Sequence, residues 1–453
     1  MISVKTLSAI RFGYGLGPNV PPVSRDTILA ALSQPDEMVR KFPVKSTRQA
    51  VELAKAFRKA RRQAKASGAR DESALREARA EIRKAASLGL VQGMARILDS
   101  PSPFRERLVW FWADHFTAVA KNTVGHAVAP AYIDEAIRPH VAGRFSDMLK
   151  SVATHPFMLT YLDQTASTGP NSAVGKKRGR GLNENLAREV LELHTLGVGS
   201  GYTQDDVRQL AELMTGLTVT RSGEFQFNPR MAQEGAETVL GKPYGGGKPK
   251  LADVFAVLDD LALNPATARH LARKIAVHFV SDTPGDGLVD HLSAAYLSSG
   301  GELGAVYAAL LEHPDAWQPA LHKAKKPFDF IASALVALGL PARDLIRMPS
   351  RDQNRLLFRP LADMGQPFMR ARGPDGWPEY AGAWITPQGL ASRISWSAGV
   401  AKKVGDKAGD PMGFLDSTLA DAASERLVWA VRQAKSAEDG IMLVFASAQF
   451  NRR

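Results

Sequence analysis

A short polar segment carries the residue types best suited to chemistry. Residues 183–197 read Asn-Glu-Asn-Leu-Ala-Arg-Glu-Val-Leu-Glu-Leu-His-Thr-Leu-Gly. Helical spacing of about 100° per residue places Glu184, Arg188 and Glu192 on one stripe. Carboxylates held between apolar positions can share protons as acid and base, or bind a hard or borderline divalent cation. The segment therefore predicts a helical site with the candidate catalytic groups Glu184, Arg188, Glu189, Glu192 and His194.

The same segment supports two other interpretations. As a structural element it is an exposed helix face laced by Glu–Arg pairs four residues apart, each worth about 0.2–0.5 kcal/mol. Such a face has no need of Asn183, Asn185 and His194 together. As a metal site it offers oxygen and nitrogen ligands alone, because the chain has no cysteine. The set expected to hold a divalent metal is Glu189, Glu192, His194 and His115.

Two further residues are expected to face this helix across a cleft. His115 lies near the end of a predicted helix over 103–120, and its alternative role is a hydrogen-bonded core histidine beside aromatic residues. Asp163 follows an apolar stretch and opens a long loop, where a carboxylate either faces a cleft or caps a helix. In this arrangement Arg188 orients a carboxylate or an anionic substrate, and a glutamate acts as the base.

The positive charge of the chain is concentrated in one segment. The net charge is +12, and residues 40–84 contain fifteen basic and five acidic residues, so that this segment carries +10. Its Ala-rich periodicity predicts a helical hairpin broken near Ser67-Gly68, whose basic side chains form either a solvated face or a surface for an anionic partner. Phe57 is the one aromatic residue between Lys45 and Lys84. Specific nucleic-acid recognition is therefore not expected.

Helical periodicity dominates the chain, and strand signals are few. The sequence predicts a mainly α fold, with a multi-helical, bundle-like architecture and at most one small β-hairpin at 217–227. The length predicts more than one packed unit. We expect an N-terminal helical region with the protruding basic hairpin (about 46–98) and the polar helix, then a hairpin or loop insertion, then a C-terminal helical region packing on the first, over residues 1–220, 221–250 and 251–453.

Targeting signals are not recognisable in the sequence. The first eighteen residues lack the charged segment and apolar core of a signal peptide. No window approaches the length of about 18 apolar residues that a transmembrane helix needs. Taken by itself, the sequence predicts a cytoplasmic protein with no transmembrane segment.

Several motifs together resemble those of a known family. Besides residues 183–197 they are Arg11–Gly15, Phe111–Phe116, Leu162-Asp163, Gly201–Val207, Leu213–Gly216, Pro265–Arg269 and Gly376–Pro378. Over nearly its whole length the chain resembles the DUF1800 family, an uncharacterised bacterial family. The resemblance implies a mostly helical fold and no established activity. Because members are often encoded beside a secreted sulfatase-like protein and many carry export signals, it also implies a sulfatase-like partner and a periplasmic location.

One segment departs from the pattern of the family it resembles. That pattern reads Phe-x-Pro-x-x-His-Asp-x-Gly-x-Lys after the predicted hairpin. Here Ala232 and Gln233 stand in place of His and Asp, and Glu237 stands in place of Lys. If those three residues act in relatives, this chain has an altered or inactive version of their site. The intact helix over 183–196 is therefore the preferred candidate site.

Two functions follow from these observations. The first is an enzyme or metal-binding protein with its site on the helix over 183–196, faced by Asp163 and His115. Any metal would be an unidentified divalent ion with oxygen and nitrogen ligands. The second is a non-catalytic helical interaction protein that docks an acidic partner, such as the sulfatase-like protein, through residues 40–84.

Overall fold

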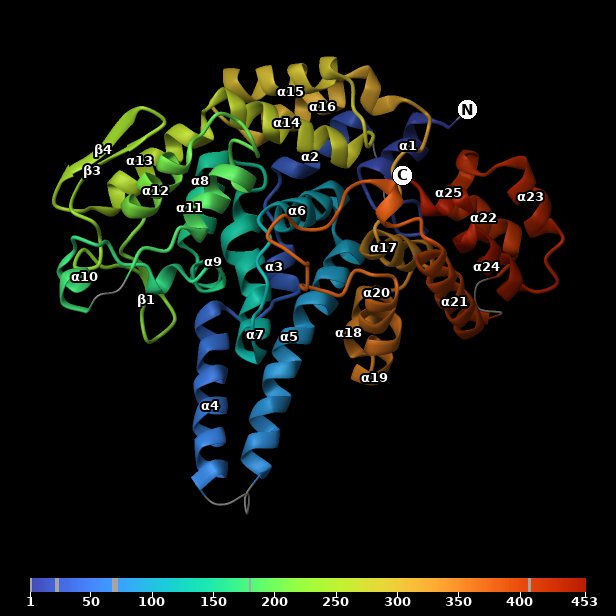
Figure 1. Ribbon diagram of the computed structural model, residues 1–453. Helices are drawn as coiled ribbons and strands as arrows, with labels where there is room; N and C mark the ends of the chain where they lie inside the picture. Colours follow the sequence, from blue (N-terminus) through green and yellow to red (C-terminus); the bar gives the residue numbers. More distant parts are fainter. Residues whose placement is uncertain (1, 21–23, 67–71, 179–180, 406–408) are drawn as a thin grey trace.

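The computed structural model describes residues 2–20, 24–66, 72–178, 181–405 and 409–453. Helices make up most of it, and its strands form two small antiparallel pairs. The predicted mainly α fold is confirmed (Figure 1). Within this described part of the chain, no helix is both long and apolar enough to cross a membrane.

The N-terminal part begins with short helices that their own side chains cap. The hydroxyl of Ser3 accepts a hydrogen bond from the amide of Thr6, and Ser24 forms a capping box with Thr27. Pro103 occupies the first turn of α6, as its position in the sequence predicts. The elements are α1 (Val4–Arg11), α2 (Arg25–Ser33), α3 (Met38–Lys41), α4 (Thr47–Ala66), α5 (Ser73–Asp99), α6 (Pro103–His115) and α7 (Thr123–Tyr132).

Helices α4 and α5 lie side by side and project from the rest of the molecule (Figure 1). Small residues such as Ala54 are buried there, whereas the described basic side chains from Arg58 to Lys84 are exposed. The predicted break at 67–68 lies outside the described residues. We call the projecting part, residues 47–66 and 73–88, the arm.

The middle of the chain contains the polar segment and its neighbours. Thr203 and Asp206, which have capping-box spacing in the sequence, form a capping box at the start of α12. The elements are the π-helix η1 (Ile133–Ile137), the 3-10 helix η2 (Arg138–His140), α8 (Phe145–Thr154), α9 (Pro156–Tyr161), the 3-10 helix η3 (Gln164–Ala166), α10 (Ala173–Arg178), α11 (Asn185–Glu189), the π-helix η4 (Val190–His194) and α12 (Gln204–Leu213).

Two hairpins follow α12. The first is the predicted one, with Thr218 paired to Gln226. The second lies beyond the single hairpin that was expected, in a segment predicted as a loop. Its turn residues Leu240 and Gly241 both have positive φ, which suits a tight hairpin, but leucine gives no turn signal. The strands are β1 (Leu217–Val219), β2 (Phe225–Phe227), β3 (Gly235–Val239) and β4 (Lys242–Gly247).

The C-terminal part is again helical. Proline starts several of these helices, as it commonly does at a first turn. The elements are α13 (Leu251–Ala262), α14 (Pro265–Phe279), α15 (Asp286–Ser298), α16 (Leu303–Glu312), η5 (Pro314–Trp317), α17 (Pro327–Ala337), α18 (Ala342–Arg347), α19 (Ser350–Gln353), the π-helix η6 (Asn354–Phe358), α20 (Arg359–Asp363), η7 (Ala381–Ala383), α21 (Pro387–Val404), α22 (Pro411–Leu419), η9 (Ala420–Ala422), α23 (Glu425–Arg432), α24 (Ala437–Ala446) and α25 (Ala448–Asn451).

Two apolar cores hold these helices together. The larger core surrounds Trp112 and Phe116. It contains side chains from helices α6 through α9, from α11 and α12, and from α13 through α16. The smaller core surrounds Phe330 and Phe445 and joins the second half of α5 with α17 and α21 to α24. Trp110 packs against both cores, so α6 lies between them. The domain boundaries expected from the sequence stay a prediction.

Candidate active site

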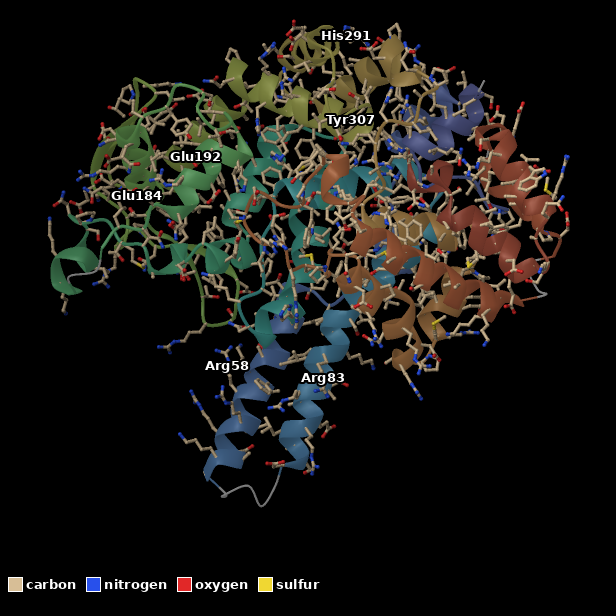
Figure 2. The ribbon with its side chains drawn as sticks, turned by 45° about the vertical axis from the view of Figure 1, so that its right-hand side comes forward. Arg58, Arg83, Glu184, Glu192, His291 and Tyr307 are labelled. Carbon is tan, nitrogen blue, oxygen red and sulfur yellow. The ribbon has the colours of Figure 1, made fainter. Side chains whose placement is uncertain are left out.

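The polar segment forms a short α-helix, α11, that continues into the π-turn η4. Arg188 donates to the carboxylates of Glu184 and Glu192, each at 3.2 Å, and to Gln204 at 2.9 Å. The predicted stripe therefore exists as a ladder of ion pairs, and Figure 2 labels its two glutamates, Glu184 and Glu192. Arg188 is engaged by these two glutamates, as the structural interpretation of the segment predicts.

Glu189 stands outside this ladder. Its half-buried carboxylate has no hydrogen bond or ion pair among the described residues. Burial, with the nearby carboxylates of Glu192 and Asp375, raises the pKa of Glu189 to about 7. The pKa of Tyr161 is raised as well, first by burial and then by Glu189, so this phenol belongs to the same neighbourhood.

His194 points to the opposite, buried side of the segment. Its ring packs against those of Phe116 and His115, with centroids 5.0 and 6.2 Å away. The Nε2–H of His115 donates to the carbonyl oxygen of His194 at 3.2 Å, and His270 donates in the same way to that of Leu193 at 3.3 Å. Burial lowers the pKa of His194 to about 3, so the histidines here are neutral.

The predicted metal ligands do not come together. Among the residues that the structure describes, no group of three or more histidine and carboxylate side chains is arranged to hold a metal ion. His115 and His194 meet in the core, while Glu189 and Glu192 lie on the outer side of the segment. The residues present therefore do not fit the expected divalent ion.

Asp163 belongs to a separate group at the surface. Its exposed carboxylate pairs with Lys121 at 2.6 Å, and its backbone adopts a left-handed conformation with φ of 56°. Asn183 donates its side-chain amide to the carbonyl oxygen of Asp163 at 3.2 Å. The end of α9 is thereby tied to the start of the polar segment.

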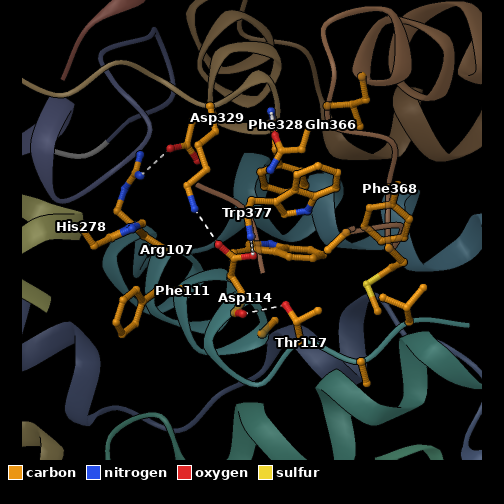
Figure 3. A pocket seen from close by; sticks show the side chains of 18 of the residues that line it. Arg107, Phe111, Asp114, Thr117, His278, Phe328, Asp329, Gln366, Phe368 and Trp377 are labelled. Atoms are coloured by element: carbon orange, nitrogen blue, oxygen red, sulfur yellow. Dashed lines mark hydrogen bonds and ion pairs between the residues drawn. The ribbon is translucent and has the colours of Figure 1, made fainter. Parts of the chain in front are cut away.

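The structure also contains a buried charged cluster that the sequence did not reveal. Lys326 pairs with Asp114 at 2.7 Å and with Glu379 at 2.8 Å, and Glu379 accepts from His278 at 2.7 Å. Beside them Arg107 pairs with Asp329 at 3.1 Å. These side chains come from α6, α14, α17 and the 371–380 loop, and Figure 3 shows most of them around one cavity. Four distant segments thus build one charged centre.

The cavity beside this cluster has a volume of about 80 Å³, enough for a few water molecules or one end of a small ligand. Tyr14, Trp110 and His278 line it, and each has a buried polar atom without a hydrogen-bond partner. Buried polar groups are normally paired, because an unmade hydrogen bond costs free energy. The cavity is therefore suited to a polar ligand.

Lys274, on α14, connects the cavity with the polar segment. Burial lowers its pKa, against the attraction of Asp114, Glu379 and Asp375, and its amine makes no ion pair with any described residue. The same lysine contributes to the lowered pKa of His194. Lys274 thus lies within the electrostatic reach of both groups, and Asp375 is shared with Glu189.

The loop that closes the cavity depends on a glycine. Gly376 has a φ of +80°, and a Cβ there would lie 2.5 Å from the carbonyl oxygen of Asp114. This close approach lets the amide of Trp377 donate to the Asp114 carboxylate at 2.9 Å. The Gly-Trp-Pro motif at 376–378 and the run Lys323-Ala-Lys-Lys326 beside an apolar helix were the sequence signals for this site, but neither identified a partner.

The segment that departs from the family pattern lies elsewhere. The side-chain oxygen of Gln233 accepts a hydrogen bond from the backbone amide of Asn171 at 3.0 Å. The backbone amide of Gln233 donates to the hydroxyl of Thr215 at 2.7 Å. Glu237 is buried beside Glu212, and burial together with their shared hydrogen bond raises its pKa to about 7. Ala232, Gln233 and Glu237 do not line the cavity.

Comparison with known proteins identifies one family. The family model described as "Protein of unknown function (DUF1800)" matches residues 9–452 of the 453. No curated protein matches the chain, and no solved structure does.

Proposed function

The chain belongs to the DUF1800 family, and from this premise we propose that it is an enzyme in which Glu189 transfers a proton. The substrate lies between this carboxylate and the cavity beside Asp114 and Lys326. Asp375 links the two, since it is electrostatically coupled to Glu189 and to Lys274, and Lys274 is coupled to Asp114 and Glu379.

The observation that carries the proposal is that Glu189 has no cation partner. Arg188 is held by Glu184 and Glu192, and its attraction for Glu189 is outweighed by burial and by the neighbouring carboxylates. A carboxyl with a pKa of about 7 is populated in both protonation states near neutral pH. This is the range in which a general acid or base is most effective.

The proposed step is a proton abstraction. A C–H bond of the substrate, or an O–H bond of a water molecule that attacks the substrate, breaks, and its proton goes to the Glu189 carboxylate. The electron pair stays on the other fragment, where the amine of Lys274, which makes no ion pair with any described residue, balances the developing negative charge. The unpartnered polar atoms of Tyr14 and His278 are available to orient the substrate.

The test is isotope uptake from water into a mixture of small molecules extracted from cells. The wild type is incubated in D₂O or in H₂¹⁸O, and mass spectrometry follows the label. We expect label to enter at least one compound, Glu189→Gln to lose this activity, and Glu425→Gln, an exposed glutamate at the start of α23, to keep it. The proposal fails if Glu189→Gln labels at the wild-type rate or if the wild type labels nothing.

A second candidate function is docking of an acidic protein, such as a sulfatase-like one, through the arm. It is favoured by the exposed basic residues Lys59, Arg62 and Lys65, which make no ion pair with any described residue. Binding of such a partner should weaken as salt rises and disappear when residues 46–84 are deleted, in a pull-down at low and high salt. A periplasmic location, tested by cell fractionation, would accompany this function.

A further inference from the structure

A groove runs along the base of the arm, where α4 meets the body of the molecule. It has a volume of about 580 Å³, within the range of small-molecule sites. One wall is α4, and another is the end of α9 with the turn between β1 and β2, where Gly223 lies against Val51. The segment 119–122 closes a third side. The groove is thus bounded by four parts of the chain.

The groove carries an excess of positive charge. Arg58 and Arg61 lie one turn apart on α4, both are exposed, and neither has an ion pair among the described residues. The third cation, Lys121, is neutralised by Asp163, which also lines the groove. The Nε–H of Arg58 donates to the carbonyl oxygen of Ala54 at 3.3 Å, which leaves its terminal nitrogens, with the guanidinium of Arg61, to bind an oxyanion.

Aromatic side chains line the groove beside these cations. They are Phe57 from α4, and Phe157 and Tyr161 from α9. The amine of Lys121 lies 5.9 Å from the centre of the Tyr161 ring. A surface of this kind favours a flat, apolar group next to a charged one.

The groove lies next to the candidate active site. Val119 lines both the groove and the cavity beside Asp114. Tyr161, at the groove, is close enough to Glu189 for the carboxylate to raise the pKa of the phenol. The groove and the proton-transferring residue therefore lie in the same neighbourhood, with Tyr161 between them in electrostatic reach of both.

We propose that this groove binds the anionic end of the substrate, an organic oxyanion that carries a flat apolar group. Arg58 and Arg61 bind the oxyanion, and the aromatic side chains bind the flat group. This inference rests on the proposed function, because it names the class of substrate that Glu189 acts on. The shared chemistry is that of a carboxylate, a sulfate or a phosphate on a ring.

The test measures binding of four related probes by calorimetry at low salt. They are 4-nitrobenzoate, 4-nitrophenyl sulfate, 4-nitrophenyl phosphate and the neutral 4-nitroanisole. We expect the neutral probe to bind at least about tenfold more weakly than the best anion, since it lacks the charge-assisted hydrogen bonds. The order among the three anions identifies which oxyanion the substrate carries.

A matched pair of double variants separates the groove from the arm as a whole. Arg58→Ala with Arg61→Ala removes two charges inside the groove, and Arg79→Ala with Arg83→Ala removes two exposed charges on α5, outside it. Figure 2 labels Arg58 and Arg83 on the two helices. The first variant should weaken anion binding about tenfold or more, and the second less than about twofold. Equal weakening in both, or equal binding of the neutral probe, overturns the inference.

Different results would contradict the groove inference and the proposed function. Glu189→Gln should bind the best anion as the wild type does, because Glu189 does not line the groove. If both the wild type and this variant bind the anion but isotope uptake is absent, the proposed function alone fails. If uptake persists unchanged in the Arg58, Arg61 double variant, the groove inference alone fails. Thermal melts confirm that the surface variants are folded.

Discussion

The amine of Lys326 lies 2.7 Å from the carboxylate of Asp114, which joins the start of α17 to the end of α6 across 212 residues of sequence. Burial alone would lower the pKa of this lysine, but the carboxylates of Asp114 and Glu379 outweigh it and raise the pKa. Charged groups this deep are retained only with partners, because their desolvation is costly. Lys326 is therefore the cation on which the buried charge of Asp114 depends.

Removing that cation should destabilise the protein strongly. We expect Lys326→Met to lower the free energy of unfolding by about 3–5 kcal/mol, because it leaves the buried carboxylate of Asp114 without its ion-pair partner. Glu379, by contrast, keeps Lys323 at 3.6 Å and Arg453 at 3.9 Å. Urea denaturation at pH 7 measures the change. The control is Lys59→Met on the arm, an exposed lysine that should change stability by less than about 0.5 kcal/mol. Similar small effects in both variants would contradict the role assigned to the pair.

Replacing the glycine beside Asp114 should also destabilise the protein. Gly376→Ala is expected to cost about 1–3 kcal/mol, since the residue has a left-handed conformation and its Cβ would meet the carbonyl oxygen of Asp114. Gly399→Ala on α21 is the matched control, because nothing lies within 4 Å of its added Cβ. That change should raise stability by about 0.5–1 kcal/mol. Thermal unfolding distinguishes the two, and a loss of stability in both would contradict this account.

Glu189 should make stability depend on pH in a defined window. Its pKa is raised in the folded protein from 4.5 to about 7, so the folded state holds the proton more tightly than the unfolded state. The resulting stabilisation is complete below about pH 4.5 and is lost as pH rises through about 7. Relative to Glu189→Gln, the wild type should become steadily less stable across that window, in urea unfolding at several pH values. A pH-independent difference would show that the carboxyl titrates normally.

Replacing Glu237 with lysine, the residue usual at this position in the family pattern, should stabilise the protein. Its buried carboxyl shares a hydrogen bond with Glu212, and burial with this neighbour raises its pKa to about 7. Glu237→Lys replaces the repulsion above that pH with an ion pair, so we expect a gain of about 1 kcal/mol at pH 8 and less at pH 5. The exposed neighbour Glu234 serves as the control, since Glu234→Lys changes the charge equally without reaching this pair. Equal gains in both variants would point to net charge alone.

Local features of the sequence predicted much of this fold. The capping box of Thr203 and Asp206 is formed by residues three apart, and the ladder through Arg188 uses spacings of four. Such patterns are set within one or two helical turns. The charged cluster could not be predicted in this way, because Asp114, Lys326 and Glu379 meet only after helices from both cores pack. The position of His194 could not be predicted from regular helical spacing either, because the π-turn at 190–194 helps direct its side chain into the core and away from the glutamates.

The length of α5 has a mechanical consequence. At about 1.5 Å per residue its 27 residues span about 40 Å as one helix, and its second half, including Leu90 and Met94, is fixed in the smaller core. A helix clamped over half its length behaves as a stiff lever. A load applied to the outer turns of α5 is therefore transmitted to the packing around these residues, and to that of Ile82 and Ala85 in the larger core.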